Sequence, residues 1–171
     1  MRLTRFTDFG LRALMRLAAE PARTFTTDEI ATAFAISRNH LTKVVRNLAG
    51  AGFVMTRRGA GGGFRLARPA EGILIGEVVR SLEARQALVE CFRVDGGCCV
   101  LKPGCKLRAM LRDARESFYQ SLDRQTLADC VSYGRQEERR EIAGLKSPRR
   151  SRVVKSRPRV NRRDRPFEGP E

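Results

Sequence analysis

A short helix, a tight break and a second helix follow one another over residues 26–48. Thr26 and Glu29 have the spacing of a capping box, which predicts that a short helix begins there. Ser37 is a residue type that favours the N-cap of the next helix. That helix has an apolar stripe at helical spacing, which consists of Leu41, Val44, Val45 and Leu48. Two helices joined by so short a break predict a helix-turn-helix.

A glycine-rich hairpin is predicted directly after these helices. Residues 53–57 and 64–67 contain strand-forming side chains, and the basic glycine run 58–63 between them suits a flexible turn. A hairpin behind a helix-turn-helix is a wing. The predicted fold class is therefore mainly α with a small β wing, a winged helix-turn-helix. Apolar spacing predicts further helices, at residues 8–20, 75–83 and 105–122.

The chain divides into three predicted parts. These are a winged helix-turn-helix domain (1–84), a cysteine-bearing loop with a long helix (85–143) and a basic tail (144–171). Within the tail, residues 145–171 hold 10 Lys and Arg against 3 Asp and Glu, and four of the seven prolines. Such a segment has little to bury, so it is predicted to be disordered. It is either an arm that adds nonspecific DNA affinity or a dispensable extension.

The charge of the chain points to double-stranded DNA as a partner. A total of 34 Lys and Arg against 19 Asp and Glu gives a net charge of +15, which favours binding to a polyanion. The second helix of the helix-turn-helix has outward donors suited to base edges and phosphates, and Asn47 is expected among them. The predicted DNA-binding residues are Ser37, Arg38, Asn39, His40, Thr42, Lys43 and Arg46 on this helix, and Arg57, Arg58 and Arg65 on or beside the wing.

Cysteines crowd into a single segment of the chain. No apolar run is long enough for a membrane helix, and the N-terminus lacks the apolar region of a secretion signal, so we expect a cytoplasmic protein without a membrane partner. Disulfides are rare in that compartment. Four of the five cysteines follow the pattern C-x6-C-C-x5-C, in which Cys91, Cys98, Cys99 and Cys105 lie among glycines and a proline.

This spacing lacks the paired C-x2-C motifs of a structural zinc site. Separated thiolates in one loop suit an iron–sulfur cluster, while zinc or thiols without metal stay open alternatives. Cys130 falls on an apolar helical stripe, which favours a buried structural thiol. An enzyme is not expected, because there is no apparent pairing of a nucleophile with a base, and the single histidine lies on the predicted DNA face.

Several segments together resemble a known family. They are RLTRFTDFGLRALMRLA, SRNHLTKVVRNLAGAGFV, RGAGGGFRLARPA and IGEVVRSLE, followed by C-x5-C-x-L. Over about residues 1–132 the chain resembles the NsrR-type nitric-oxide-sensing iron–sulfur winged-helix repressors, a family that also includes IscR and RirA. The segment SRNH favours the nitric-oxide-sensing members. A RirA-like regulator that responds to iron is the alternative.

The resemblance implies a homodimer, joined by the long helix at 105–122, that binds a palindromic operator. It implies three cysteine ligands per subunit, matching Cys91, Cys99 and Cys105, with Cys98 as an alternative to Cys99. It also implies a fourth ligand, Asp8 of the partner subunit, although a residue at this position would also suit a helix N-terminus. A 4Fe–4S cluster is favoured and a 2Fe–2S cluster is the reserve. Nitric oxide as the signal would release the operator and relieve repression under nitrosative stress.

Overall fold

The computed structural model describes residues 2–59, 61–101 and 104–131. Helix α1 (Arg5–Ala19) begins three residues before the sequence prediction because Thr4 caps it, and the Thr4 side chain accepts a hydrogen bond from the Thr7 backbone N–H. The sequence predicted a stripe of Leu11, Leu14, Met15 and Ala18, but of these only Leu14 is buried; the buried face also includes Ala13 and Leu17, and Met15 is exposed. This face packs into the centre of the core.

Helices α2 (Thr27–Ala33) and α3 (Arg38–Gly50) form the predicted helix-turn-helix. The capping box is confirmed, since the Glu29 backbone N–H donates to Thr26 Oγ1 at 3.2 Å and the Thr26 backbone N–H donates to a Glu29 carboxylate oxygen at 2.7 Å. The turn between the helices needs a left-handed residue, Ala35, with φ of 52°. Ser37 is the N-cap of α3, as predicted, but its side chain makes no capping hydrogen bond.

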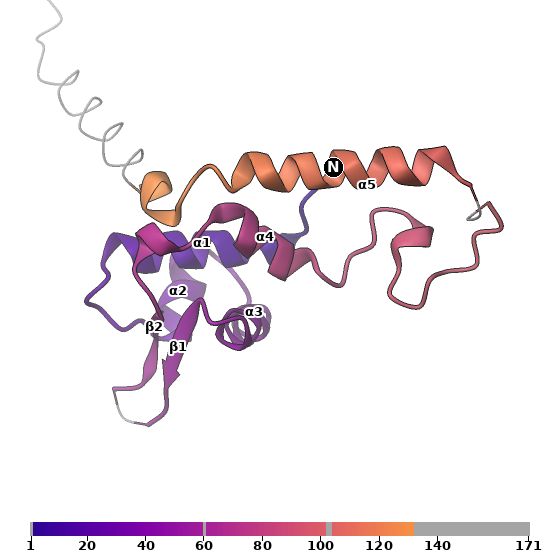
Figure 1. Cartoon of the computed structure of the whole chain (residues 1–171). Coiled ribbons are helices and arrows are strands. Elements are labelled where there is room, and N and C mark those ends of the chain that lie inside the picture. Colours follow the sequence, from indigo (N-terminus) through magenta and orange to yellow (C-terminus); the bar gives the residue numbers. More distant parts are fainter. Residues whose placement is uncertain (1, 60, 102–103, 132–171) are drawn as a thin grey trace, which may run out of the picture.

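The wing is an antiparallel hairpin of β1 (Val54–Arg57) and β2 (Gly63–Leu66), and it extends beside α3 (Figure 1). Phe25 pairs with Phe64 through two backbone hydrogen bonds of 2.8 and 3.0 Å, which attach the wing to the segment before α2. Gly59 and Gly61 have φ of 92° and 72°, so the wing tip uses conformations that glycine adopts readily. The fold is the predicted mainly α winged helix with a small two-stranded sheet.

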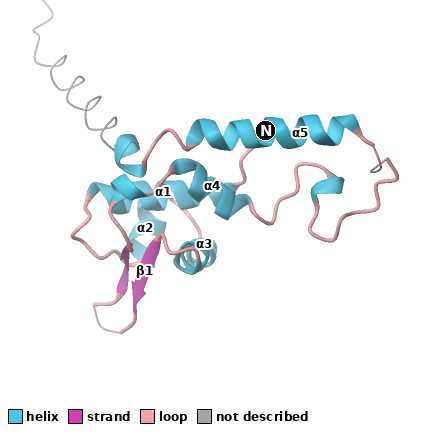
Figure 2. Ribbon diagram, viewed as in Figure 1, coloured by secondary structure: helices cyan, strands magenta, loops and turns pink. Residues whose placement is uncertain are grey.

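The remaining elements follow the wing in the chain, and the two helices among them lie on the side opposite the wing (Figure 2). They are a 3-10 turn at Ala70–Gly72, α4 (Ile75–Glu83), a 3-10 turn at Glu90–Phe92 and α5 (Lys106–Leu122). Backbone bonds from Ile75 N–H to Gln125 and from Leu127 N–H to Ile73 fix the segment after α5 to the start of α4. Tyr119 and Leu127 therefore belong to the same core as α1 and α3.

Helix α5 buries only its C-terminal half. The sequence predicted an apolar stripe of Leu107, Leu111, Ala114, Phe118 and Leu122, but Leu107 and Ala114 are exposed and the buried residue is Tyr119. The N-terminal half of α5 runs past the end of α4, and the segment that joins the two helices lies beside it (Figure 1), with the Arg115 guanidinium 4.8 Å from the Phe92 ring centroid. A regular apolar stripe is thus present, but only part of it belongs to the core of this chain.

The predicted first part of the chain, 1–84, ends one residue beyond α4. The second part, 85–143, is described as far as residue 131, and the predicted disordered tail 144–171 lies outside the described residues. Among residues 2–59, 61–101 and 104–131, no helix is long and apolar enough to cross a membrane.

Candidate DNA-binding surface and cysteine loop

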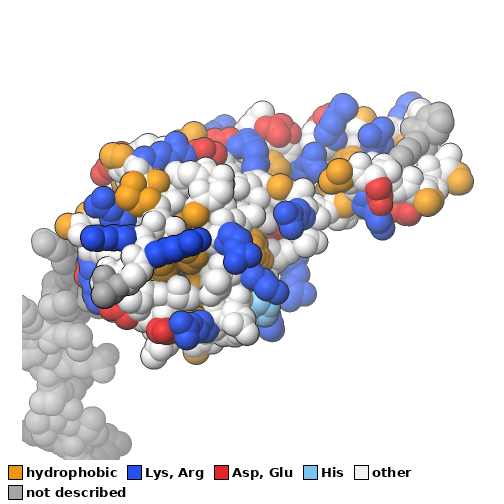
Figure 3. Space-filling view, turned by 90° about the horizontal axis from the view of Figure 1, so that it is seen from below, with side chains coloured by type: hydrophobic (Ala, Val, Ile, Leu, Met, Phe, Trp, Pro, Cys, Tyr) orange, Lys and Arg blue, Asp and Glu red, His pale blue; other side chains and the backbone are white. Residues whose placement is uncertain are grey.

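The predicted DNA-binding residues all have exposed side chains in the structure. They are Ser37, Arg38, Asn39, His40, Thr42, Lys43, Arg46, Arg57, Arg58 and Arg65. Figure 3 shows Lys and Arg side chains spread across the face that carries α3 and the wing, close to the histidine. The expectation for Asn47 is wrong: it is half-buried, and its side-chain oxygen is buried without a hydrogen-bond partner among the described residues.

Contacts within the helix-turn-helix orient the first turn of α3. The Thr42 hydroxyl donates to the Arg38 backbone carbonyl at 2.9 Å, and Arg38 also makes an exposed ion pair with Asp28 of α2 at 3.0 Å. The ring of His40 lies beside that of Phe9 of α1, with centroids 6.3 Å apart. The exposed end of α3 is therefore held by contacts from both α2 and α1.

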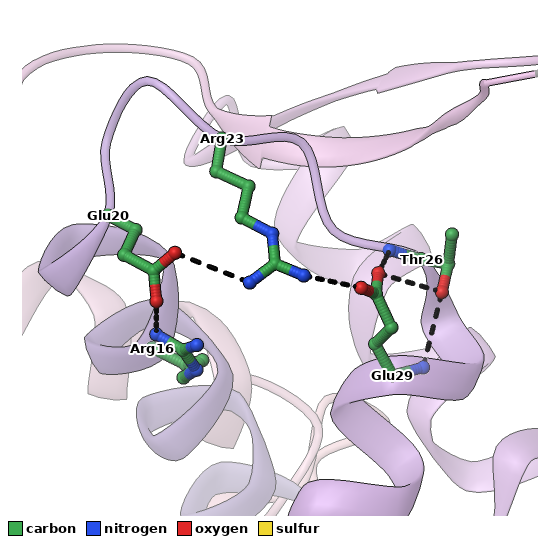
Figure 4. A network of polar contacts seen from close by, with 5 residues as sticks. All are labelled: Arg16, Glu20, Arg23, Thr26 and Glu29. Atoms are coloured by element: carbon green, nitrogen blue, oxygen red, sulfur yellow. Dashed lines mark hydrogen bonds and ion pairs between the residues drawn. The ribbon is translucent and has the colours of Figure 1, made fainter.

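A network of charged side chains joins the end of α1 to the start of α2 (Figure 4). The Arg23 guanidinium bridges Glu20 and Glu29, at 3.3 and 2.6 Å, and Arg16 pairs with Glu20. The backbone N–H of Thr26 and then its hydroxyl lower the pKa of Glu29, with a smaller contribution from Arg23. These exposed contacts connect the two helices on the surface, above the core residues that both helices contribute.

We use "cysteine loop" for residues 84–105, which join α4 to α5 and whose described part projects beyond the core (Figure 1). Cys91, Cys98, Cys99 and Cys105 are all free thiols; Cys98 is exposed and the other three are half-buried. Cys91 and Cys105 line one pocket of about 530 Å³, and four cationic side chains line it too: Lys106, Arg108, Arg112 and Arg115. The structure thus brings the first and last cysteine of the loop to one basic cavity.

Cys98 and Cys99 do not line this cavity. The Cys98 backbone N–H donates to a carboxylate oxygen of Glu90 at 3.1 Å. In the described part of this single chain, no three Cys, His, Asp or Glu side chains come close enough together to hold a metal ion.

Cys130 is half-buried against the core, and burial raises the pKa of its thiol, as befits a structural cysteine.

Asp8, the residue considered as a ligand from the partner subunit, lies in the first turn of α1. Its side chain is 46% exposed and makes an ion pair of 2.9 Å with Arg12, one turn further along the helix. The carboxylate is therefore on the surface, where a second subunit has access to it. An acid in this turn also suits the helix dipole.

Sequence reasoning missed Glu83, whose carboxylate is buried at the end of α4. It lies on the same helical face as Ile75 and Val79, at spacings of eight and four residues. An acidic residue in line with an apolar stripe was the signal that could have found it.

The fold and the surface define a winged-helix DNA-binding regulator. The model of the Rrf2 family, described as iron-dependent transcriptional regulators, matches residues 3–133. The chain belongs to the Rrf2 family of transcriptional regulators, and it is not an enzyme.

Two relatives are both named HTH-type transcriptional regulator NsrR. The one from Geobacillus kaustophilus is 46% identical over 153 residues, which cover 88% of this chain and 99% of the relative. The one from Bacillus subtilis is 45% identical over 132 residues, covering 77% and 90%. Likeness at this level extends across both the winged helix and the cysteine loop.

Solved structures give the same fold. CymR, the global cysteine regulator of B. subtilis, superposes with a TM-score of 0.61 at 27% identity, covering 78% of this chain and 98% of that one. IscR of T. potens has the same TM-score at 24% identity and covers 78% and 88%.

Proposed function

We propose that this protein is a homodimeric transcriptional repressor that binds a palindromic operator and senses nitric oxide through an iron–sulfur cluster. The observation that carries the proposal is the 46% identity to a regulator named NsrR over 99% of that relative, which includes the cysteine loop as well as the winged helix. If the relative were similar only in the DNA-binding part, the alignment would not extend over the cysteine loop.

DNA recognition rests on α3 and the wing. The exposed donors Arg38, Asn39 and His40 at the N-terminal end of α3 would enter the major groove first. The Ser37 hydroxyl is exposed and makes no capping hydrogen bond, so it would be available to a phosphate. Arg57 and Arg58 near the wing tip would reach the adjacent groove or backbone. A two-fold dimer presents two such surfaces, so its operator would be a palindrome with a fixed spacing of half-sites.

The exposed half of α5 supports dimerisation. Leu107 is 60% exposed and Met110 is 66% exposed, and both lie on the part of the helix that leaves the core. Apolar side chains in such a row favour burial against another protein surface. A second copy of the same helix would cover them in an isologous interface.

The residues of the loop fit an iron–sulfur cluster by their chemistry. Thiolates are the usual ligands of such clusters, and here the four thiols are free and at least partly accessible. Two of them, Cys91 and Cys105, line a basic cavity that would offset negative charge. Cys91, Cys99 and Cys105 would hold the cluster, with Cys98 as the alternative to Cys99 and with Asp8 of the partner subunit as fourth ligand. When bound, the cluster would supply iron that reacts with nitric oxide; a 4Fe–4S cluster is favoured over 2Fe–2S.

This set of ligands would join the two subunits. The cysteines belong to the loop of one subunit and Asp8 to α1 of the other, and α1 contacts α3 through the Phe9 and His40 rings. The position of α1 would therefore set the separation of the two α3 helices, on which the match to both half-sites depends. Without that bond between subunits, α1 is free to shift and operator affinity falls.

Titration of anaerobically purified protein with nitric oxide tests the proposal. We expect the visible absorbance of the cluster and operator binding to be lost together, at matching stoichiometry. Absorbance that is lost while operator binding persists would contradict the proposal. A colourless protein that binds zinc would contradict the cluster itself.

A response to iron is the second candidate, because the family is described as iron-dependent. It uses the same ligands and differs only in the signal. An iron chelator separates the nitric-oxide sensor from the iron sensor, when it is used at a concentration at which the protein still responds to nitric oxide. Release of the operator by the chelator alone favours the iron sensor.

A further inference from the structure

Glu83 is a buried carboxylate at the junction of α4 and the cysteine loop. It is the last residue of α4, only 6% of it is exposed, and the cysteine loop begins at the next residue. One of its oxygens accepts hydrogen bonds from the Thr4 backbone N–H at 2.8 Å, from the Thr4 hydroxyl at 2.9 Å and from the Thr7 hydroxyl. Burying a carboxylate is costly unless donors satisfy it, and here the donors of one helix turn do so.

The donors lie in the part of α1 that carries Asp8. Thr4 is the N-cap of α1, and Thr7 is fully buried next to Asp8 in the sequence. The carboxylate of Glu83 therefore ties the first turn of α1 to the exact point where the chain enters the cysteine loop. Among the described residues, Glu83 is the only buried charged side chain, so this is the one buried charge that links α1 to the end of α4.

The same stretch of α1 is packed tightly against α3, the recognition helix of the proposed DNA-binding surface. A Cβ atom at Gly10 would lie 2.6 Å from Leu82 Cδ1 of α4 and 3.5 Å from Val44 Cγ1 of α3, so three helices meet there without spare room. One residue earlier, Phe9 lies beside His40. A close-packed junction transmits a shift of one helix to its neighbours instead of absorbing it.

We propose that Glu83 is a positioning residue that couples the cysteine loop to the recognition helix. It holds the first turn of α1 on the end of α4, so a displacement of the loop moves Asp8 and, through Phe9 and Gly10, moves α3. The coupling rests on the proposed function, because loss of the cluster is the signal that would displace the loop. The contacts that transmit the displacement lie within a single subunit. It differs from the ligand bond of Asp8, which joins two subunits.

Three variants separate this role from simple stabilisation. Glu83→Met removes the acceptor at similar side-chain size, and Thr7→Val removes one donor while it keeps the shape of the side chain. Glu83→Gln keeps an acceptor oxygen and is the conservative rescue. Glu77→Gln is the matched control, because Glu77 lies on the same helix and its carboxylate pairs at the surface with Arg68, at 2.7 Å.

The measurement is the ratio of operator affinities of the cluster-loaded and cluster-free full-length protein. Coupling between two sites typically changes affinity by about 5- to 150-fold. We expect a wild-type ratio in that range, retained by Glu83→Gln and Glu77→Gln, and reduced at least about fivefold by Glu83→Met and by Thr7→Val. The variant that combines Thr7→Val with Glu83→Met should have the same affinity ratio as Glu83→Met alone, because both substitutions disrupt the same hydrogen-bond network. If both forms lose affinity equally and the ratio is unchanged, Glu83 is only structural and the proposal is overturned.

Amide hydrogen exchange of the cluster-free protein gives a readout that does not depend on the cluster. Glu83→Met should speed exchange both in the first turn of α1 and in the residues that follow Glu83, and Glu77→Gln should speed neither. Unchanged exchange in α1 would overturn the coupling. A wild-type affinity ratio of one would instead contradict the proposed function, and the exchange result would still decide the role of Glu83.

Discussion

The winged-helix part of the molecule and the cysteine loop differ in how completely they bury their apolar side chains. Leu14, Leu41 and Val44 are fully buried at the centre of a single core, whereas Val94 and Val100 of the loop are 97% and 89% exposed. Burial of apolar surface is the main stabilising contribution to folding. The winged-helix part therefore has a core of its own, whereas in the proposed function a cluster and a second subunit would complete the loop.

The largest expected effect separates the cysteines of the loop from the cysteine of the core. Cys105→Ala should abolish the cluster and its visible absorbance, because it removes a ligand. Cys130→Ala is the control, because the Cys130 thiol of the wild type is half-buried against the core and is not a proposed ligand. This variant should keep the absorbance. Cys98→Ala should keep it too if Cys99 is the ligand. Loss of absorbance in Cys98→Ala but not in Cys99→Ala would reverse that assignment.

A pair of apolar substitutions tests the difference in packing. Leu48→Ala, in the buried stripe of α3, should lower the free energy of unfolding by about 2–5 kcal/mol. Val94→Ser, in the exposed loop, should change it by less than about 0.5 kcal/mol. Urea denaturation of the cluster-free protein, at one fixed protein concentration, measures both changes in the free energy of unfolding. Equal losses would mean that the loop is packed as firmly as the core.

A third comparison addresses the basic surface. Arg46→Ala on the exposed side of α3 should weaken operator binding by about 1–3 kcal/mol. Arg124→Ala removes an exposed arginine just after α5, away from α3 and the wing, and serves as the control of equal charge. Fluorescence anisotropy at fixed salt measures both. Equal weakening by both variants would show that net charge, not the α3 surface, accounts for the affinity.

The smallest expected effect concerns the capping box at the start of α2. Thr26→Ala should lower the free energy of unfolding by about 1 kcal/mol at neutral pH, and Thr26→Ser should keep most of it. The Thr26 backbone N–H and, after it, the Thr26 hydroxyl lower the pKa of Glu29 from its ordinary value of 4.5, and the alanine variant removes only the hydroxyl. The contribution of the hydroxyl to stability is present above that pH and is lost as the pH falls through the lowered value. The difference between wild type and Thr26→Ala should therefore shrink in acid. A constant difference across that range would contradict the role of the ionised Glu29.

Local rules predicted the winged-helix part well. The capping box of Thr26 and Glu29, the apolar stripe of α3 and the two strands of the wing are features of short segments, and the structure confirms them. The helix Ile75–Glu83 was predicted to the residue. In each case the pattern within a segment and its packing in the core favour the same structure.

Features that depend on distant parts of the chain were harder to predict. The apolar stripe predicted for α5 did not show which part of the helix packs on the core of this chain, because helical periodicity does not say which surface covers an apolar face. Asn47 was placed outward, and the structure half-buries it. Glu83 was read as a helix end, because its donors, Thr4 and Thr7, lie more than 70 residues away. The ligand roles of the cysteines and of Asp8 stay predictions.

Native mass spectrometry of anaerobically purified protein tests most directly whether the cysteine loop is completed by a cluster and a second subunit. We predict a dimer that carries one iron–sulfur cluster in each subunit, and for Cys105→Ala a species without clusters. An iron-free monomer, or a dimer that carries zinc in place of iron and sulfide, would contradict the account.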